Sequence, residues 1–478
     1  MRRSLLAVWL VLLAGSAVRA ENVTPIRSNG PSSNRIDVVV LGDGYTASEM
    51  AIYAADAETF IAGLFGQEPF LEYESYFNVF RVDVVSSDSG ADHPSRGVYK
   101  DTALDAAYDC SGITRLICVN TTKVNEVLNR SLPASQRELV IVLVNDPEYG
   151  GSGGAVAVTS THSSGVEIVL HEVGHSFGLL ADEYDSSPPA CNNTVEPAQA
   201  NVTRETNRNL IKWNAGGGPP AGWIELSQPV PTPVLTPGVG LFQGAKYCTT
   251  GLYRPTTDSK MRSLGRPFGP VNVEQLIKRI YNAVYPVDAW TPEETTLQAA
   301  AGDVVSFSAT VMRPRTHAIG MAWYVDGVLA GQDGRLEVDA AGLSGGAHQV
   351  EARGRDLTPA VRSDPQRLLE RPMTWTLIVL SSLFEPLDFS GRKVLNRNLL
   401  RGEYIDILSW KENPRNENVG GYRLYLSEAG GKRLLARLDV GAFEYRRRGV
   451  GRDSAATYLL HAVTPEGMEG PPAAVTVR

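Results

Sequence analysis

The pattern of apolar residues changes once along this chain, close to Pro292, and that change most constrains the fold. Before it, short runs of β-branched and aliphatic residues alternate with stretches of helical spacing. After it, the sequence indicates only short alternating strands, joined by Asp-Gly and Gly-Gly turns. Because alternating strands and helices are typical of a mixed sheet packed by helices, we expect an α+β or α/β unit followed by all-β units.

The predicted N-terminal unit begins with a buried strand, a glycine turn and a helix. Val38–Leu41 are apolar throughout, and Thr46 with Glu49 forms a Thr-x-x-Glu capping box at the helix start. The region 186–260 is rich in Pro, Asn, Gly and Thr, so we expect irregular loops there. Further strands are predicted at 77–87 and 138–146, and a closing helix at 271–285.

The all-β part of the chain reads as two sandwiches. Trp410, Tyr422 and Tyr458 are spaced much as in a fibronectin type III domain, which indicates this fold for the second sandwich. The predicted boundaries are 1–20 for a signal peptide, 21–290 for the mixed unit, 291–378 for an immunoglobulin-like sandwich and 379–478 for a fibronectin type III-like sandwich.

The N-terminus indicates export. Arg2 and Arg3 precede the apolar run Leu5–Leu13, and Val18–Ala20 offers a small-residue cleavage site. This run is too short to span a bilayer, so we expect a cleaved signal, no membrane insertion, and a periplasmic or extracellular protein. The net charge of −8 argues against nucleic acid as a partner.

Export gives the four cysteines a simple interpretation. An oxidising compartment favours disulfides. The chain contains no CxxC pair, which argues against a metal site built from cysteine thiolates. Four cysteines allow three pairings, of which we predict the local one, Cys110–Cys118 and Cys191–Cys248.

The motif that carries chemistry is "HEVGH". On a helix, His171 and His175 lie on one face and can share a metal ion. Imidazole nitrogen suits zinc, and a third protein ligand leaves a fourth position for water. Glu172 is rotated by about 100° from His171, which places it to take a proton from a zinc-bound water as general base and acid. HExxH is a short pattern that also occurs by chance. The alternative to a zinc site is therefore a structural helix that buries two hydrogen-bonded histidines.

The third ligand is expected from the acidic cluster that follows. Gly178 can end the helix, because glycine tolerates a left-handed turn that reverses the chain. The histidine of the longer HExxHxxGxxH pattern is absent, since Ala181 stands in its place. Asp182 is the predicted ligand, and Glu183 is an alternative that spacing alone does not exclude.

Several separated blocks carry a family resemblance. "LGDGYTASEM", "GGSGGAVAVTS", "HEVGHSFGLLADEY", "GLYRPTTDSKMRSLGRPFGPV" and "NVEQL" together resemble the IgA-peptidase-type zinc metallopeptidases, a metzincin-like family, over about residues 30–285. The resemblance implies one catalytic zinc ion and a methionine-containing turn beneath it, which Met261 would supply. Family members often carry cysteines around that turn, whereas this chain has Ser259, Gly269 and Asn272.

Two functions follow as hypotheses. In the first, the protein is a secreted zinc endopeptidase that acts on protein or peptide substrates, and its β-sandwiches hold protein, glycan or a cell surface. In the second, it is an adhesion or binding protein with a degenerate peptidase domain. The intact His-Glu-His set favours the first. An exposed edge strand beside "GGSGGAVAV" could pair with a peptide substrate, and Tyr184, Tyr247 and Tyr253 are candidate oxyanion donors.

Overall fold

The computed structural model describes residues 21–478 apart from 187–190, 215–218, 220, 301–302, 344–345, 381–382, 398–401, 429–430 and 466. The predicted signal peptide, residues 1–20, lies outside the described residues. The chain divides into two compact units. The first contains residues up to Pro286 together with Met312–Ile319 and Asp356–Leu369, and the second contains the rest.

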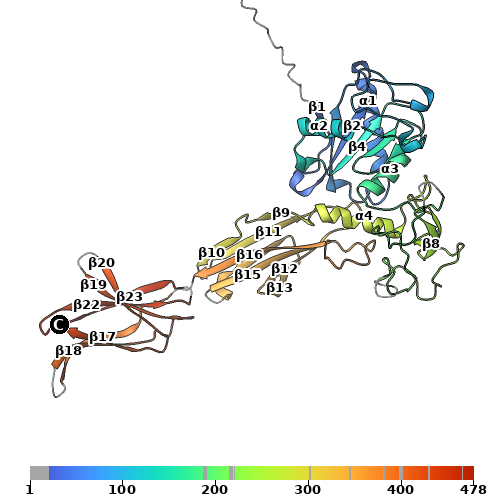
Figure 1. Cartoon of the computed structure of the whole chain (residues 1–478). Coiled ribbons are helices and arrows are strands. Elements are labelled where there is room, and N and C mark those ends of the chain that lie inside the picture. The colour runs from blue at the N-terminus through green and yellow to red at the C-terminus, as the bar shows by residue number, and fades with distance from the viewer. Residues whose placement is uncertain are drawn as a thin grey trace, which may run out of the picture. The chain divides into compact units, whose positions relative to one another are not determined.

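A six-stranded mixed sheet forms the centre of the first unit, in the order β1-β3-β2-β4-β6-β5 (Figure 1). The strands β3, β2, β4 and β6 are parallel, whereas β1 and β5 pair antiparallel at the two edges. The helix α1 (Met50–Leu64) joins β2 to its parallel neighbour β3, and the helix α2 (Thr121–Ser131) lies between β3 and β4, which is the alternation expected from the sequence. The connection from β4 to its parallel neighbour β6 contains only β5. The strands are β1 (Asn22–Arg27), β2 (Ile36–Asp43), β3 (Phe77–Asp83), β4 (Leu139–Val144), β5 (Gly151–Ser152) and β6 (Ala157–Ser160).

Helices cover both faces of this sheet. Val38 and Val40 face a core built with the helices α1 (Met50–Leu64), α3 (Gly165–Ser176) and α4 (Pro270–Ala283). The intervening Val39 and Leu41 face a second core, which contains apolar residues of α2 (Thr121–Ser131). β2 is therefore buried on both sides, and this explains why its apolar residues form an unbroken run.

The capping box predicted from the sequence is present. The Thr46 N–H donates a 2.8 Å hydrogen bond to Glu49 Oε2, and a short 3-10 turn leads into α1. The prediction of irregular loops throughout 186–260 is wrong at its end, because β7 (Phe242–Ala245) and β8 (Cys248–Arg254) form a hairpin. Its two turn residues, Lys246 and Tyr247, both have positive φ. Such turns are usually signalled by Asn-Gly or Asp-Gly, so this sequence hides the hairpin.

Both predicted disulfides are present. Cys110 bonds to Cys118, and Cys191 bonds to Cys248. Two disulfides indicate a protein of an oxidising compartment, extracellular or periplasmic. Among the described residues, no helix has the length and apolar character needed to cross a bilayer.

The second unit contains two separate cores between β-sheets. In the first sandwich a five-stranded sheet, β10-β16-β15-β12-β13, faces a three-stranded sheet, β14-β11-β9, around Phe307, Trp323 and Trp375. The strands are β9 (Val287–Thr291), β10 (Thr296–Ala300), β11 (Val304–Val311), β12 (Gly320–Val325), β13 (Val328–Gly331), β14 (Arg335–Asp339), β15 (Gly346–Arg355) and β16 (Glu370–Leu380).

The second sandwich packs the sheet β17-β18-β21 against the sheet β20-β19-β22-β23. Its core contains Trp410, Tyr422 and Tyr458, the three aromatic residues that indicated the fold. The mostly-β C-terminal part of the chain thus fits the predicted β-sandwiches. The strands are β17 (Leu387–Arg397), β18 (Gly402–Lys411), β19 (Gly421–Glu428), β20 (Gly431–Leu438), β21 (Glu444–Val450), β22 (Ala456–Val463) and β23 (Glu469–Val477).

Candidate active site

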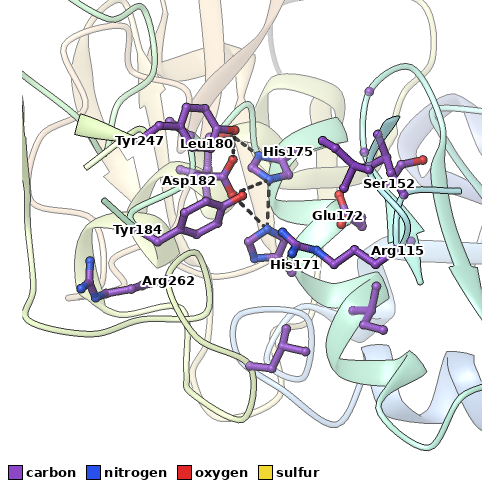
Figure 2. Close-up of a pocket in the computed structure, with 18 of the residues that line it drawn as sticks. Arg115, Ser152, His171, Glu172, His175, Leu180, Asp182, Tyr184, Tyr247 and Arg262 are labelled. Atoms are coloured by element: carbon purple, nitrogen blue, oxygen red, sulfur yellow. Dashed lines mark hydrogen bonds and ion pairs between the residues drawn. The ribbon is translucent and has the colours of Figure 1, made fainter. Parts of the chain in front are cut away.

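The helix α3 brings the two motif histidines together. Its buried side, which includes Leu170 and Val173, packs into the core of the first unit. The histidines lie on the side that faces a cleft, and the Nε2 atoms of His171 and His175 are 3.1 Å apart (Figure 2). The core-facing apolar residues thus fix the direction in which both imidazoles point.

The chain reverses directly after α3. The Leu179 N–H donates to the His175 carbonyl at 3.1 Å, which closes the helix with the 5→1 bond of an αL motif. The residue in the left-handed region is Leu179, with φ of 53°, and not the expected Gly178. Gly178 is needed for a different reason, because a Cβ there would lie 2.6 Å from the Gly174 carbonyl oxygen.

The reversal carries Asp182 back to the histidines. Its Oδ1 lies 3.1 Å from Nε2 of His171 and 3.2 Å from Nε2 of His175. Its other oxygen, Oδ2, accepts a hydrogen bond from the Tyr247 hydroxyl. Of the two acidic residues that the sequence offered, Asp182 is therefore the one beside both imidazoles.

Glu183 points the other way, into the protein. Its fully buried carboxylate accepts hydrogen bonds from Asn201 at 3.0 Å, Ser259 at 2.7 Å and Asn272 at 2.8 Å. Ser259 and Asn272 are two of the positions where relatives were expected to carry cysteines. In this chain they bind a carboxylate instead, and the Glu183 N–H donates to the Met261 carbonyl at 2.8 Å.

The donor set fits a divalent metal ion. Nδ1 of His171 lies 2.9 Å from the Lys260 carbonyl, and Nδ1 of His175 lies 2.8 Å from the Leu180 carbonyl. Since a carbonyl only accepts, each Nδ1 carries the proton and each Nε2 keeps a lone pair. Asp182 Oδ1 is buried and accepts no hydrogen bond from a described residue. Three lone pairs that converge without a shared proton need a cation, and two nitrogens with one oxygen suit zinc.

Without a metal ion, a proton takes the place of that cation. Burial lowers the pKa of His175, but hydrogen bonding to Asp182 outweighs burial and raises this pKa to about 9. Burial also acts to raise the pKa of Asp182, yet its contacts with His171 and His175 hold it well below its usual range. Metal binding at this site therefore competes with protonation.

Glu172 lies beside the two imidazoles. Its carboxylate and a ring nitrogen of each histidine are mutually within 4.8 Å. Burial raises the pKa of Glu172, and no described residue donates a hydrogen bond to its carboxylate. A carboxylate in this state is a better proton acceptor than one in water.

The glycine-rich segment, residues 151–154, approaches Glu172 closely at Gly153. A Cβ on Gly153 would lie 2.6 Å from Glu172 Oε2 and 3.1 Å from Cβ of His175, so a side chain there would displace the Glu172 carboxylate. The edge strand β5 is not open along its whole length, because the Gly151 N–H donates to the Arg115 carbonyl at 3.1 Å. Backbone that a substrate strand could pair with is left at the exposed Gly153 and Gly154.

Met261 is fully buried beneath α3. A Cβ on Gly174 would lie 2.4 Å from Met261 Sδ, so the glycine inside the HEVGH motif makes room for this methionine. The preceding Lys260 has a fully buried side chain that forms an ion pair with Glu167 of α3. This pair connects α3 to the segment whose carbonyl orients His171.

The histidines open into a cleft of about 910 Å³. Tyr184 and Tyr247 line it, and the hydroxyl of Tyr247 is already committed to Asp182. Tyr253, the third tyrosine considered from the sequence, packs in a separate apolar cluster and does not line the cleft. Arg115 also lines the cleft, and the Lys260–Glu167 ion pair supports it. Neither had a recognisable sequence signal, because both depend on contacts between distant segments.

Residues 24–237 match the family model of IgA peptidase M64. This part of the chain belongs to the IgA peptidase M64 family. The family predicted from the sequence is thereby confirmed, and the M64 match includes α3 and Asp182. Tyr247, Met261 and Asn272 lie beyond the matched segment but belong to the same compact unit.

No curated protein shows a significant match to the chain. Among solved structures, the chain is similar to an FN3tt mutant, with 22% identity, coverage of 20% of this chain and 89% of that one, and a TM-score of 0.15. It is also similar to an Fn3-like protein from Clostridium thermocellum, with 21% identity, coverage of 20% and 88%, and a TM-score of 0.15. The FN1–FN3 domains of chicken CNTN1 match with 10% identity, coverage of 39% and 63%, and a TM-score of 0.22.

Proposed function

We propose that the protein is a secreted, zinc-dependent endopeptidase with a metzincin-like catalytic domain. Family membership supports a peptidase that acts on protein substrates. The observation that carries the zinc dependence is the convergence of His171 Nε2, His175 Nε2 and Asp182 Oδ1, within 3.1 to 3.2 Å of one another. These three side chains would hold the ion, and the two β-sandwiches would hold substrate, glycan or a surface.

Zinc held by these residues would supply Lewis acidity toward the scissile carbonyl and toward the attacking water. Glu172 accepts a proton from the attacking water and then delivers it to the amine nitrogen of the leaving peptide. Its burial and its free lone pairs favour this exchange. The backbone at Gly153 and Gly154 lets an extended substrate chain pass close above Glu172.

The decisive experiment separates chemistry from metal binding. Glu172→Gln keeps the size of the side chain but removes its ability to accept the proton. We expect kcat on casein or a derived peptide to fall by about 10²–10⁴, the usual contribution of general acid–base catalysis, while bound zinc measured by elemental analysis stays at one per chain.

Two controls complete the test. Glu126→Gln, on the exposed face of α2, should retain wild-type activity. His171→Ala should lose both zinc and activity, and a chelator should abolish casein cleavage reversibly. Full activity in Glu172→Gln, or in the metal-free protein, would reject the proposed mechanism in favour of another hydrolytic group. Absence of cleavage by the wild-type protein would favour the adhesion hypothesis.

A further inference from the structure

One wall of the cleft is the loop closed by the Cys110–Cys118 disulfide. The loop is held at its base by two hydrogen bonds of 2.9 Å between Ala107 and Cys118. It is held internally by the Cys110 N–H, which donates to the Leu116 carbonyl at 3.3 Å. The Arg115 carbonyl accepts a hydrogen bond from Gly151, so the backbone of Arg115 is fixed against the edge of the central sheet.

The side chain of Arg115 extends from this loop toward the two histidines (Figure 2). It lines the cleft, and it lies close enough for its charge to act on Glu172 and Tyr184. No described residue accepts a hydrogen bond from its guanidinium or forms an ion pair with it. Arg115 thus presents a positive charge with several unused N–H donors to whatever occupies the cleft.

The other two cations of the cleft are already engaged. Lys246 Nζ donates to Gln199 Oε1 at 3.1 Å. Arg262 donates to the Glu183 carbonyl at 2.9 Å and pairs with Asp185 at 3.2 Å. Of the three cations that line the cleft, Arg115 is therefore the one whose binding capacity is left for a substrate.

We propose that Arg115 is a specificity-determining residue that binds a carboxylate of the substrate near the scissile bond. This inference rests on the proposed peptidase function and names its substrate class. The planar guanidinium presents paired N–H donors in the geometry of a carboxylate and keeps its charge at all relevant pH values. Because the loop is fixed at both ends, little ordering of the enzyme opposes binding. The carboxylate is either an Asp or Glu side chain or the C-terminus of the peptide.

The test uses matched peptides and the full chain. A casein fragment that the wild-type protein cleaves is synthesised with Glu, Gln or Lys at one position at a time, covering two positions before and two positions after the cleaved bond. Every peptide is made with a free and with an amidated C-terminus. The variants are Arg115→Ala, Arg115→Lys and Arg115→Glu, and the control is Arg137→Ala, because Arg137 binds Asn129 outside the cleft.

We expect one Glu position to raise kcat/KM about tenfold over Gln in the wild type and in Arg137→Ala, as a charged hydrogen bond typically contributes. Arg115→Ala should bring this ratio close to one, and Arg115→Lys should leave an intermediate ratio. Arg115→Glu should invert the preference toward a Lys peptide, which a misfolded loop would not do. A preference that follows amidation instead of the Glu position assigns the carboxylate to the peptide C-terminus.

Binding gives a second readout that does not need turnover. In a Glu172→Gln background, fluorescence anisotropy should show the Glu peptide bound about tenfold more tightly than the Gln peptide, and Arg115→Ala should remove the difference. Equal cleavage and equal binding of acidic and neutral peptides would overturn the inference while leaving the peptidase intact. Arg115-dependent binding together with cleavage that needs neither zinc nor Glu172 would sustain the inference and overturn the proposed function.

Discussion

The hydroxyl of Tyr281, on α4, donates a 2.7 Å hydrogen bond to the carboxylate of Asp356, which lies in a segment between two strands of the first sandwich. The same carboxylate oxygen accepts a 2.7 Å bond from Tyr73, and the other oxygen lies 2.7 Å from Nε2 of His317. The side chain of Asp356 is fully buried. The segments 312–319 and 356–369 therefore complete the core of the peptidase unit, although they follow it in sequence.

Replacing Asp356 by Asn should destabilise this unit. The change removes a buried negative charge that accepts hydrogen bonds from two tyrosines, so we expect a loss of about 2–4 kcal/mol in unfolding free energy. Calorimetry on the full chain measures the effect as a lower Tm of the corresponding transition. Asp388→Asn, at a largely exposed site paired with Lys411, should leave all transitions unchanged. An unshifted Tm in Asp356→Asn would mean that this hydrogen-bond network is dispensable.

The same contacts bear on where the peptidase domain ends. A chain that stops at residue 290, the boundary predicted from the sequence, lacks Asp356 and His317 and leaves the hydroxyls of Tyr73 and Tyr281 without their acceptor. We expect it to be protease-sensitive, whereas a chain that stops at residue 380 should resist limited proteolysis. Equal resistance of both chains would support the shorter boundary.

The two acidic residues after the helix should respond differently to loss of charge. Asp182→Asn removes the negative charge beside both histidines and should weaken zinc binding by at least about 100-fold. A residue that only hydrogen-bonds a metal ligand typically contributes about 10–100-fold. Glu183→Gln should keep zinc but lower stability by about 1–3 kcal/mol, because its carboxylate is buried among hydrogen-bond donors. Competition with a chelating dye gives the affinities, and thermal unfolding gives the stabilities. The reverse pattern would make Glu183 the ligand.

Tyr247 should act on the metal through Asp182. Tyr247→Phe removes the donor to Oδ2 without changing the ring, so we expect zinc affinity to fall about 10–100-fold with the fold intact. The dye competition assay measures this, and circular dichroism checks the fold. Tyr253→Phe, outside the cleft, is the matched control and should bind zinc as the wild type does. Wild-type affinity in Tyr247→Phe would show that Asp182 does not need this donor.

The last sandwich should lose stability in acid through Glu469. Burial acts to raise its pKa, but hydrogen bonds from Lys432, Tyr425 and Arg423 outweigh burial and lower the pKa to about 2. Since this folded value lies below the ordinary 4.5, Glu469 stabilises the fold fully above pH 4.5 and loses that effect as the pH falls toward about 2. Glu469→Gln should therefore lower the Tm of this sandwich at pH 7 by several degrees and leave it unchanged near pH 2. Equal shifts at both pH values would contradict the sign of the pKa change.

Local sequence predicted much of the fold and of the candidate site. The continuous apolar run of β2, the capping box at Thr46 and the spacing of His171 and His175 each depend on neighbours a few residues apart, which periodicity captures. The cysteine pairing followed from compartment and proximity. The roles assigned to Glu172, His171, His175 and Asp182 stay predictions until metal binding and turnover are measured.

What the sequence did not reveal depends on contacts between distant segments. The left-handed residue is Leu179 because packing and helix closure override the glycine preference one position earlier. The β7–β8 turn lacks its usual residues, since Lys246 and Tyr247 are held there by the Asp182 and Tyr184 carbonyls. The isolated position of Arg115 in the cleft and the contribution of segments 312–319 and 356–369 have no local pattern at all.

Ser259 and Asn272, at two positions where cysteines were expected in relatives, donate hydrogen bonds to the carboxylate of Glu183. The segment that carries Met261 is thus anchored by groups that neither oxidise nor need an oxidant to form. A reductant such as dithiothreitol would break Cys110–Cys118 in the cleft wall and Cys191–Cys248 next to Tyr247, but it would leave the hydrogen bonds of Glu183 beneath the histidines in place.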